Sequence, residues 1–130
     1  MLTDKFPYLK GLILDMDGVL WRDAQAIGNL PALFAKISDL GLRYVFATNN
    51  ATKTFVEYQE KLQSFGLVVQ PEQIITSAET TALYLKEHYS QGTWVYVVGS
   101  DSLKAVLRKH GFHISPADEF HNAEVVVVGM

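Results

Sequence analysis

A short apolar run that ends in two acids is the feature that most constrains this chain. Residues 11–14 read Gly-Leu-Ile-Leu, and Asp15-Met16-Asp17-Gly18 follows them directly. Such a run is typical of a fully buried strand in a parallel sheet. Residues two apart on an extended chain point to the same side, so we expect both carboxylates to converge at the strand's end. Open α/β sheets bind their ligands beyond the strand tips, which predicts a site here.

Paired carboxylates at a strand tip suit two kinds of chemistry. They can hold Mg²⁺, which prefers oxygen ligands and keeps several waters. One acid can also attack phosphorus to give an aspartyl-phosphate while the other moves the proton. Gly18 allows a sharp backbone turn, so that main-chain N–H groups can face a phosphate. The alternative is an ordinary strand end, where Asp and Gly are common turn residues.

The overall composition narrows the class of protein. The chain has 130 residues, enough for one domain with a real core, and its 48% hydrophobic content is ordinary for a soluble protein. The formal charge of −3 argues against a nucleic-acid partner. No cysteine is present, which excludes a disulfide framework and thiolate metal ligands. No segment resembles a signal peptide or membrane span, so we expect a cytoplasmic protein with no membrane contact.

Strand and helix patterns alternate along the chain. Asn29 is placed to cap the first long helix, and Gly41 to end it. A strand–helix–strand unit of this length implies parallel neighbouring strands. The expected strands are 11–14, 43–47, 73–76, 94–98 and 124–128; the expected helices are 30–40, 54–65, 78–89 and about 100–110, with a helical turn at 116–120. The pattern predicts an α/β fold with a parallel sheet.

A second group of polar residues follows the next expected strand. Thr48, Asn49 and Asn50 would bring a hydroxyl, two amides and a helix N-terminus to the tip beside Asp15 and Asp17. Those are the donors that an anion needs. Taken alone, the same residues could simply form a turn that caps the following helix. The two tips together favour a phosphate site.

These motifs resemble those of a known family. The segments 15–20 and 48–50 are similar to the first and second motifs of the haloacid dehalogenase (HAD) superfamily of phosphatases. The segments 46–51, 75–78 and 98–99 resemble its nitrophenylphosphatase and NagD-like branch, in matching order along nearly the whole chain. The resemblance implies an HAD-like, Rossmann-like parallel sheet with helices on both faces, followed by the beginning of an inserted α/β cap. It also implies a Mg²⁺-dependent phosphatase that acts on a small phosphorylated metabolite.

The resemblance also implies roles for single residues. Asp15 would be the nucleophile and a Mg²⁺ ligand; Asp17 would be the general acid and base, and its main-chain carbonyl would bind the metal. Thr48 and Asn49, with Asn50 beside them, would hold the phosphoryl group, helped by backbone N–H groups from Met16 to Gly18. Trp21 would line the substrate entrance, although packing in the core is an equally good interpretation.

The chain departs from the family after its first two motifs. The family's later lysine and second acidic group have no counterpart here, and Lys53, Lys86, Lys104 and Lys109 are expected on helix surfaces. We expect a core first half over residues 1–91 and the start of a cap, truncated, over 92–130. The expectation is a chain that binds Mg²⁺ and phosphate weakly and turns over slowly.

Two further interpretations stay open beside the enzyme. The chain could be a catalytically inactive HAD-fold fragment that acts as a binding or self-association module. An uncovered strand at 11–14 would be an exposed edge and would invite pairing with another chain. Alternatively, the valine-rich strands 94–98 and 124–128 could fold back beside it.

A response-regulator receiver is disfavoured because the third expected strand ends in Thr76-Ser77 rather than in an aspartate. The four histidines are expected at the surface rather than as metal ligands.

Overall fold

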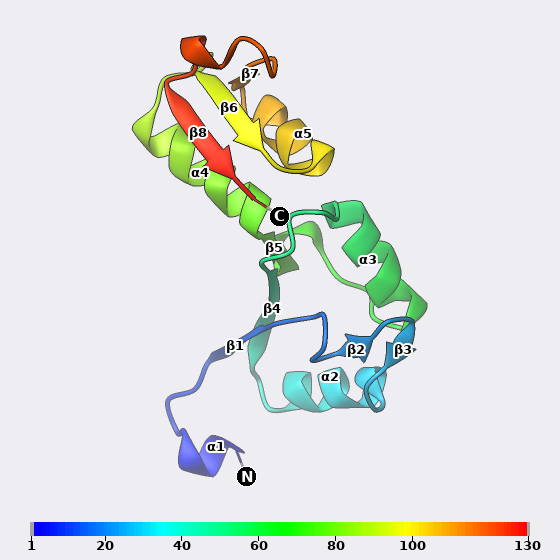
Figure 1. Ribbon diagram of the computed structural model, residues 1–130. Helices are drawn as coiled ribbons and strands as arrows, with labels where there is room; N and C mark the ends of the chain where they lie inside the picture. The colour runs from blue at the N-terminus through cyan, green and yellow to red at the C-terminus, as the bar shows by residue number, and fades with distance from the viewer. Residues whose placement is uncertain (1, 130) are drawn as a thin grey trace. The chain divides into compact units, whose positions relative to one another are not determined.

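The computed structural model describes residues 2–129, which form two compact units (Figure 1). The first unit contains the chain up to Thr48 and the segment Phe55–Ile75. The second contains the short segment Asn49–Thr54 and the chain from Thr76 onward. The chain therefore passes between the units three times. The division expected from the sequence, with a core first half over residues 1–91 and the start of a cap over 92–130, stays a prediction.

The first unit is built on a sheet with the strand order β1-β4-β5. Strands β1 (Gly11–Leu14) and β4 (Arg43–Thr48) are parallel, with Gly11 opposite Arg43 and Leu14 opposite Phe46. Strand β5 covers Ile74–Thr76. The parallel pairing of the first two strands, which the strand–helix–strand spacing predicts, is confirmed. The carboxyl ends of β1 and β4 lie at the same edge of the sheet.

Two helices add buried residues to the core of the first unit. Helix α2 (Leu30–Asp39) begins as expected at Asn29, whose side chain accepts a hydrogen bond from the amide of Ala32 at 3.0 Å. It buries Leu30, Phe34 and Ile37, which share one face at helical spacing. Helix α3 (Phe55–Ser64) buries Tyr58 and Leu62, four residues apart. The smaller elements are α1 (Leu2–Lys5), the antiparallel pair β2 (Trp21–Arg22) and β3 (Gln25–Ala26), and η1 (Pro71–Gln73).

Strand β1 is less buried than its apolar sequence predicts. Ile13 is 77% exposed, while Leu12 and Leu14 are partly buried against the core. The expectation of a fully buried strand is wrong in this structure because β1 stands at the end of the sheet order and is covered on one face. An apolar run indicates that its residues favour burial, but it does not determine how many strands and helices pack against the strand.

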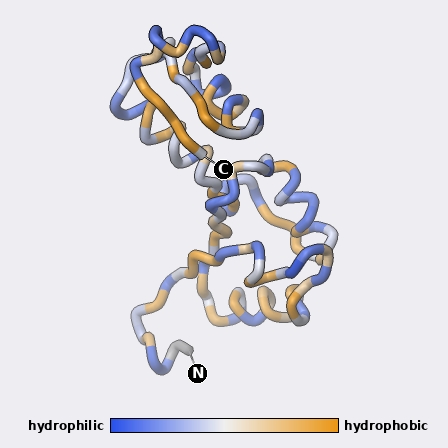
Figure 2. The backbone as a smooth tube through the Cα atoms, in the orientation of Figure 1, coloured by the Kyte–Doolittle hydropathy of each residue, from blue (hydrophilic) through white to orange (hydrophobic). Residues whose placement is uncertain are grey.

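The second unit is a smaller α/β layer. Its parallel sheet has the order β7-β6-β8, with β7 at His113–Ile114, β6 at Trp94–Val98 and β8 at Val125–Val128. Helices α4 (Ser77–His88) and α5 (Asp101–Lys109) lie on one face of this sheet (Figure 1). Both β6 and β8 are hydrophobic along their length (Figure 2), and they leave Trp94, Val98, Val126 and Val128 exposed, with Val126 at 63%.

The alternative in which the valine-rich strands fold back beside β1 is wrong. Strands β6 and β8 pair with each other, from Val95 opposite Val125 to Val98 opposite Val128. Their shared core with α4 and α5 explains this choice, because each helix offers an apolar face to that sheet. The helical turn expected at 116–120 is η2, which forms slightly later, at Phe120–Asn122.

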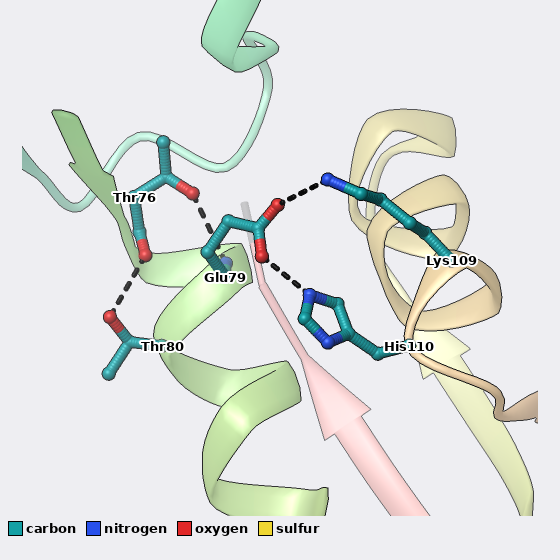
Figure 3. Close-up of polar contacts among 5 residues, drawn as sticks. All are labelled: Thr76, Glu79, Thr80, Lys109 and His110. Atoms are coloured by element: carbon teal, nitrogen blue, oxygen red, sulfur yellow. Dashed lines mark hydrogen bonds and ion pairs between the residues drawn. The ribbon is translucent and has the colours of Figure 1, made fainter. Parts of the chain in front are cut away.

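A polar contact joins the two helices of the second unit (Figure 3). The Glu79 carboxylate accepts a 2.6 Å hydrogen bond from His110 Nε2, and Lys109 Nζ lies 3.5 Å from its other oxygen. The Thr76 hydroxyl caps α4 by accepting the amide of Glu79 at 3.1 Å. His110, expected at the surface, is therefore partly buried in a contact between α4 and the end of α5. Among the described residues, no helix is long and apolar enough to cross a bilayer.

Candidate functional site

The tips of β1 and β4 bring together the first polar groups of the two sequence motifs. Asp15 follows the last residue of β1, and Thr48 is the last residue of β4. Because the strands are parallel and in register up to Leu14 and Phe46, both tips reach the same edge of the sheet. The juxtaposition that the sequence predicts for these tips is therefore present within the first unit.

Asp17 is held by two aromatic side chains. Trp21 Nε1 donates a 2.8 Å hydrogen bond to Asp17 Oδ1. The Tyr58 hydroxyl donates a 2.9 Å hydrogen bond to Asp17 Oδ2 and lies 3.2 Å from Thr48 Oγ1. Each carboxylate oxygen thus has its own donor, and both donors belong to buried residues, Trp21 at 1% and Tyr58 at 0% exposure. Asp17 itself is exposed, so its carboxylate is both accessible and oriented.

The turn after Asp15 explains how Trp21 reaches Asp17. The carbonyl of Met16 accepts the amides of Val19 and Leu20 at 3.1 and 2.9 Å. Gly18 has φ +83°, a conformation that L side chains rarely adopt, and its amide donates to the carbonyl of Trp21 at 2.8 Å. The chain therefore folds back on itself and returns the indole to the carboxylate four residues earlier.

Tyr58 is the residue that the sequence did not single out for the site. Burial is the main cause that raises the pKa of Tyr58 to about 12; its bond to Thr48 opposes this rise, and its bond to Asp17 adds to it. The phenol therefore stays protonated, and remains a donor, at neutral pH. Its position in the apolar stripe of α3 predicts core packing, which is also correct, since its ring lies 6.4 Å from that of Trp21.

Trp21 belongs to the core rather than to an entrance. It is 1% exposed and its ring packs 5.6 Å from that of Phe65, with Lys61 Nζ 4.7 Å above it. Of the two interpretations of Trp21, packing is confirmed and the substrate entrance is wrong. The physical reason is that the turn at Gly18 directs the indole inward, where its only polar atom is satisfied by Asp17.

Asp15 differs from Asp17 in its surroundings. Its carboxylate is exposed and accepts the amide of Met16 at 2.8 Å. The amides of Met16 and Gly18, expected to face a phosphate, therefore both have acceptors within the chain. The acceptor for the Met16 amide is the exposed side chain of Asp15, whereas the bond of the Gly18 amide is part of the turn. The phosphate-binding roles of these two residues stay predictions.

Asn49 and Asn50 lie in the second unit, outside the group formed by Asp15, Asp17, Thr48 and Tyr58. The Asn49 carbonyl accepts the hydroxyl of Ser77 at 3.2 Å, and the Asn50 side chain accepts the amide of Thr52 at 2.9 Å. Asn50 therefore shapes a turn, as the alternative interpretation of this segment expects, although helix α3 begins only at Phe55. Their phosphate-binding roles stay predictions.

The segment between Asn50 and α3 is held by later residues. The carbonyls of Ala51 and Thr52 accept the hydroxyls of Ser100 and Ser102 at 2.8 and 3.2 Å. Lys53, expected on a helix surface, lies in this turn and is partly buried. The segment thus takes its conformation from the start of α5, far along the sequence.

The donor set at the first tip fits a hard cation. Asp15 offers an exposed carboxylate and Asp17 the main-chain carbonyl that the family resemblance implies, and oxygen is the ligand that Mg²⁺ prefers. In residues 2–129 no group of three or more His, Asp or Glu side chains could hold a metal ion. Mg²⁺ does not need such a group, since it commonly binds through one or two carboxylates, waters and substrate phosphate.

Comparison with known proteins places the chain in a family. A family model described as haloacid dehalogenase-like hydrolase matches residues 12–113. Glycerol-3-phosphate phosphatase of Gallus gallus is 36% identical over 107 residues, which cover 81% of this chain and 34% of that protein. Among solved structures, a p-nitrophenyl phosphatase from Archaeoglobus fulgidus superposes with a TM-score of 0.81 at 32% identity over 94% of this chain and 45% of its own.

A more distant solved structure carries a metal. Glycerol phosphate phosphatase from Mycobacterium tuberculosis, in complex with magnesium, has a TM-score of 0.77 at 26% identity over 94% of this chain and 36% of its own. The chain thus spans less than half the length of each of these proteins. Fold, motif order and sequence agree: the chain belongs to the haloacid dehalogenase-like hydrolases, in their nitrophenylphosphatase and NagD-like branch.

Proposed function

We propose that Asp15 and Asp17 form the reacting pair of a Mg²⁺-dependent phosphatase that hydrolyses a small phosphorylated metabolite through an aspartyl-phosphate. The observation that carries the proposal is the contrast between the two acids. Asp15 presents an exposed carboxylate, whereas both oxygens of Asp17 are oriented by buried donors. An accessible carboxylate suits a nucleophile, and a fixed one suits proton transfer.

The reaction follows from these roles. An Asp15 oxygen attacks phosphorus, the bond from phosphorus to the leaving oxygen breaks, and Asp17 gives that oxygen its proton. Water then attacks phosphorus in the aspartyl-phosphate and gives a proton to Asp17. The bond between phosphorus and the Asp15 oxygen breaks, so that inorganic phosphate leaves and the Asp15 carboxylate is restored. Mg²⁺ bound at the two aspartates would offset the charge of the phosphoryl oxygens.

The proposed substrate is a small phosphate monoester. Relatives of this chain are named for glycerol phosphate and p-nitrophenyl phosphate, which share only the monoester group. We expect slow turnover by these 130 residues, because the later lysine and acidic group that the family resemblance implies have no counterpart in them. No nucleic-acid partner is proposed, and the cytoplasm is the proposed compartment.

The test is hydrolysis of p-nitrophenyl phosphate by highly purified chain, with Mg²⁺ and with excess EDTA. We expect slow activity that needs Mg²⁺ and disappears in Asp15→Asn. Asp118→Asn is the matched control, since this exposed carboxylate lies in the second unit. Hydrolysis that survives in Asp15→Asn, or that is equal with EDTA, would refute the proposal.

A second candidate function is self-association through β1. The strand stands at the end of its sheet and exposes Ile13, which is the pattern of an edge that pairs with other chains. Light scattering over a concentration series tests it. We expect a mass above the 14.5 kDa monomer for the wild type and a shift toward the monomer in Ile13→Lys. A wild-type monomer at every concentration would exclude this function.

A further inference from the structure

The hydroxyl of Tyr58 links the two motifs of the site. It comes from α3, an element that neither motif includes, yet it lies between the acid of the first motif and the threonine of the second. Thr48 is 7% exposed and Tyr58 is 0% exposed, so bulk water does not compete strongly for the contact between their hydroxyls. A buried hydroxyl with a charged acceptor makes one of the stronger classes of protein hydrogen bond.

The direction of the bonds follows from counting protons. A phenol has one O–H, and this one is donated to Asp17 Oδ2. The 3.2 Å contact with Thr48 then requires the threonine hydroxyl to donate to the phenol oxygen. The hydrogen bonds therefore run from Thr48 through Tyr58 to Asp17, and one side chain fixes the orientation of both motif residues.

We propose that Tyr58, together with Trp21, is a positioning residue that holds the Asp17 carboxyl group in the orientation needed to protonate the leaving oxygen. Trp21 holds Oδ1 and Tyr58 holds Oδ2, so the carboxyl plane is fixed at both ends. The proposal rests on the proposed function for its chemistry, but the network itself can be measured without turnover. Neither aromatic residue is proposed to touch the substrate.

The kinetic test compares Tyr58→Phe with the wild type on two substrates. Nitrophenolate leaves readily without a proton, whereas the alkoxide of glycerol 3-phosphate needs one. Misplacement of Asp17 should therefore lower kcat/KM for glycerol 3-phosphate about tenfold more than for p-nitrophenyl phosphate, as expected when one hydrogen bond to a charged group is lost. A merely structural role would lower both equally, and either an equal loss or no loss would overturn the proposal.

If the wild type hydrolyses neither substrate, that result counts against the proposed function but not against the role of Tyr58. A second measurement tests that role without turnover. The chain has two tryptophans, Trp21 and Trp94, so Trp94→Phe assigns their indole N–H resonances. In Tyr58→Phe, we expect the Trp21 indole resonance to shift and its hydrogen exchange to accelerate, because Asp17 loses the hydrogen bond from Tyr58 and is held less firmly against Trp21. An unchanged Trp21 resonance in a folded variant would overturn the proposal.

Discussion

Removing the Asp17 side chain should destabilise the first unit, although catalytic acids are often dispensable for folding. In Asp17→Ala, the indole N–H of Trp21 loses its acceptor at a residue that is 1% exposed. An unsatisfied buried donor costs about 1–3 kcal/mol. Tyr58 also loses an acceptor, but it can turn its hydroxyl toward Thr48, so its share is smaller. We therefore expect a loss of about 2–3 kcal/mol in the free energy of unfolding.

Asp15→Ala is the matched control for this prediction. Its carboxylate is exposed and accepts the amide of the next residue, so we expect a change within about 0.5 kcal/mol. Urea denaturation followed by Trp21 fluorescence, in a Trp94→Phe background, reports the first unit specifically, since the two tryptophans lie in different units. Equal losses in both variants, or no loss in Asp17→Ala, would refute the claim that Asp17 is held by buried donors.

Three further perturbations follow from the structure. Folding raises the pKa of Tyr58 from 10.0 to about 12, so the stability that Tyr58 contributes should be complete below pH 10 and be lost as the pH rises toward 12. A spectrophotometric titration of the wild type should show a late phenolate step that is absent from Tyr58→Phe. Identical titration curves for the two proteins would contradict this prediction. Glu79→Ala should lower the stability of the second unit by about 1 kcal/mol, because the hydrogen bond to His110 is lost. Lys109→Ala removes only an exposed 3.5 Å contact and should change the stability little. Unfolding followed by Trp94 fluorescence measures both variants, and equal effects would argue against a role for His110. In Gly18→Ala, the added Cβ would have no neighbouring atom within 4 Å, so the substitution should be unfavourable only because of the backbone angle φ +83°. We expect the free energy of unfolding, measured by urea denaturation, to fall by about 1–2 kcal/mol. An unchanged free energy would mean that the turn relaxes.

Local signals in the sequence predict much of this fold. Asn29 caps α2 because an amide side chain before an apolar helical stripe satisfies the first-turn amides. The parallel pairing of β1 and β4 follows from the helix between them, since only a crossover fits that spacing. These features depend on neighbouring residues, and the sequence displays them directly.

Other features depend on contacts between distant residues. The apolar run of β1 predicts burial, but the exposure of Ile13 depends on which strands lie beside it. Tyr58 fits the apolar stripe of α3 as well as Phe would, so nothing in the stripe reveals that its hydroxyl reaches Asp17, 41 residues earlier. An aromatic residue with a polar tip in a stripe after the second motif is the signal that could have suggested it. The membership of Asn49 and Asn50 in the second unit likewise depends on contacts of their segment with Ser100, 49 residues beyond Ala51.

The central claim, that Asp15 accepts a phosphoryl group beside Mg²⁺, can be tested without turnover. Beryllium fluoride mimics a phosphoryl group on an aspartate, and ¹⁹F NMR distinguishes the bound from the free species. We expect a bound signal with the wild-type chain that requires Mg²⁺, is absent from Asp15→Asn and persists in Asp118→Asn. A bound signal that is unchanged in Asp15→Asn, or no bound signal for the folded wild-type chain at saturating Mg²⁺, would contradict it.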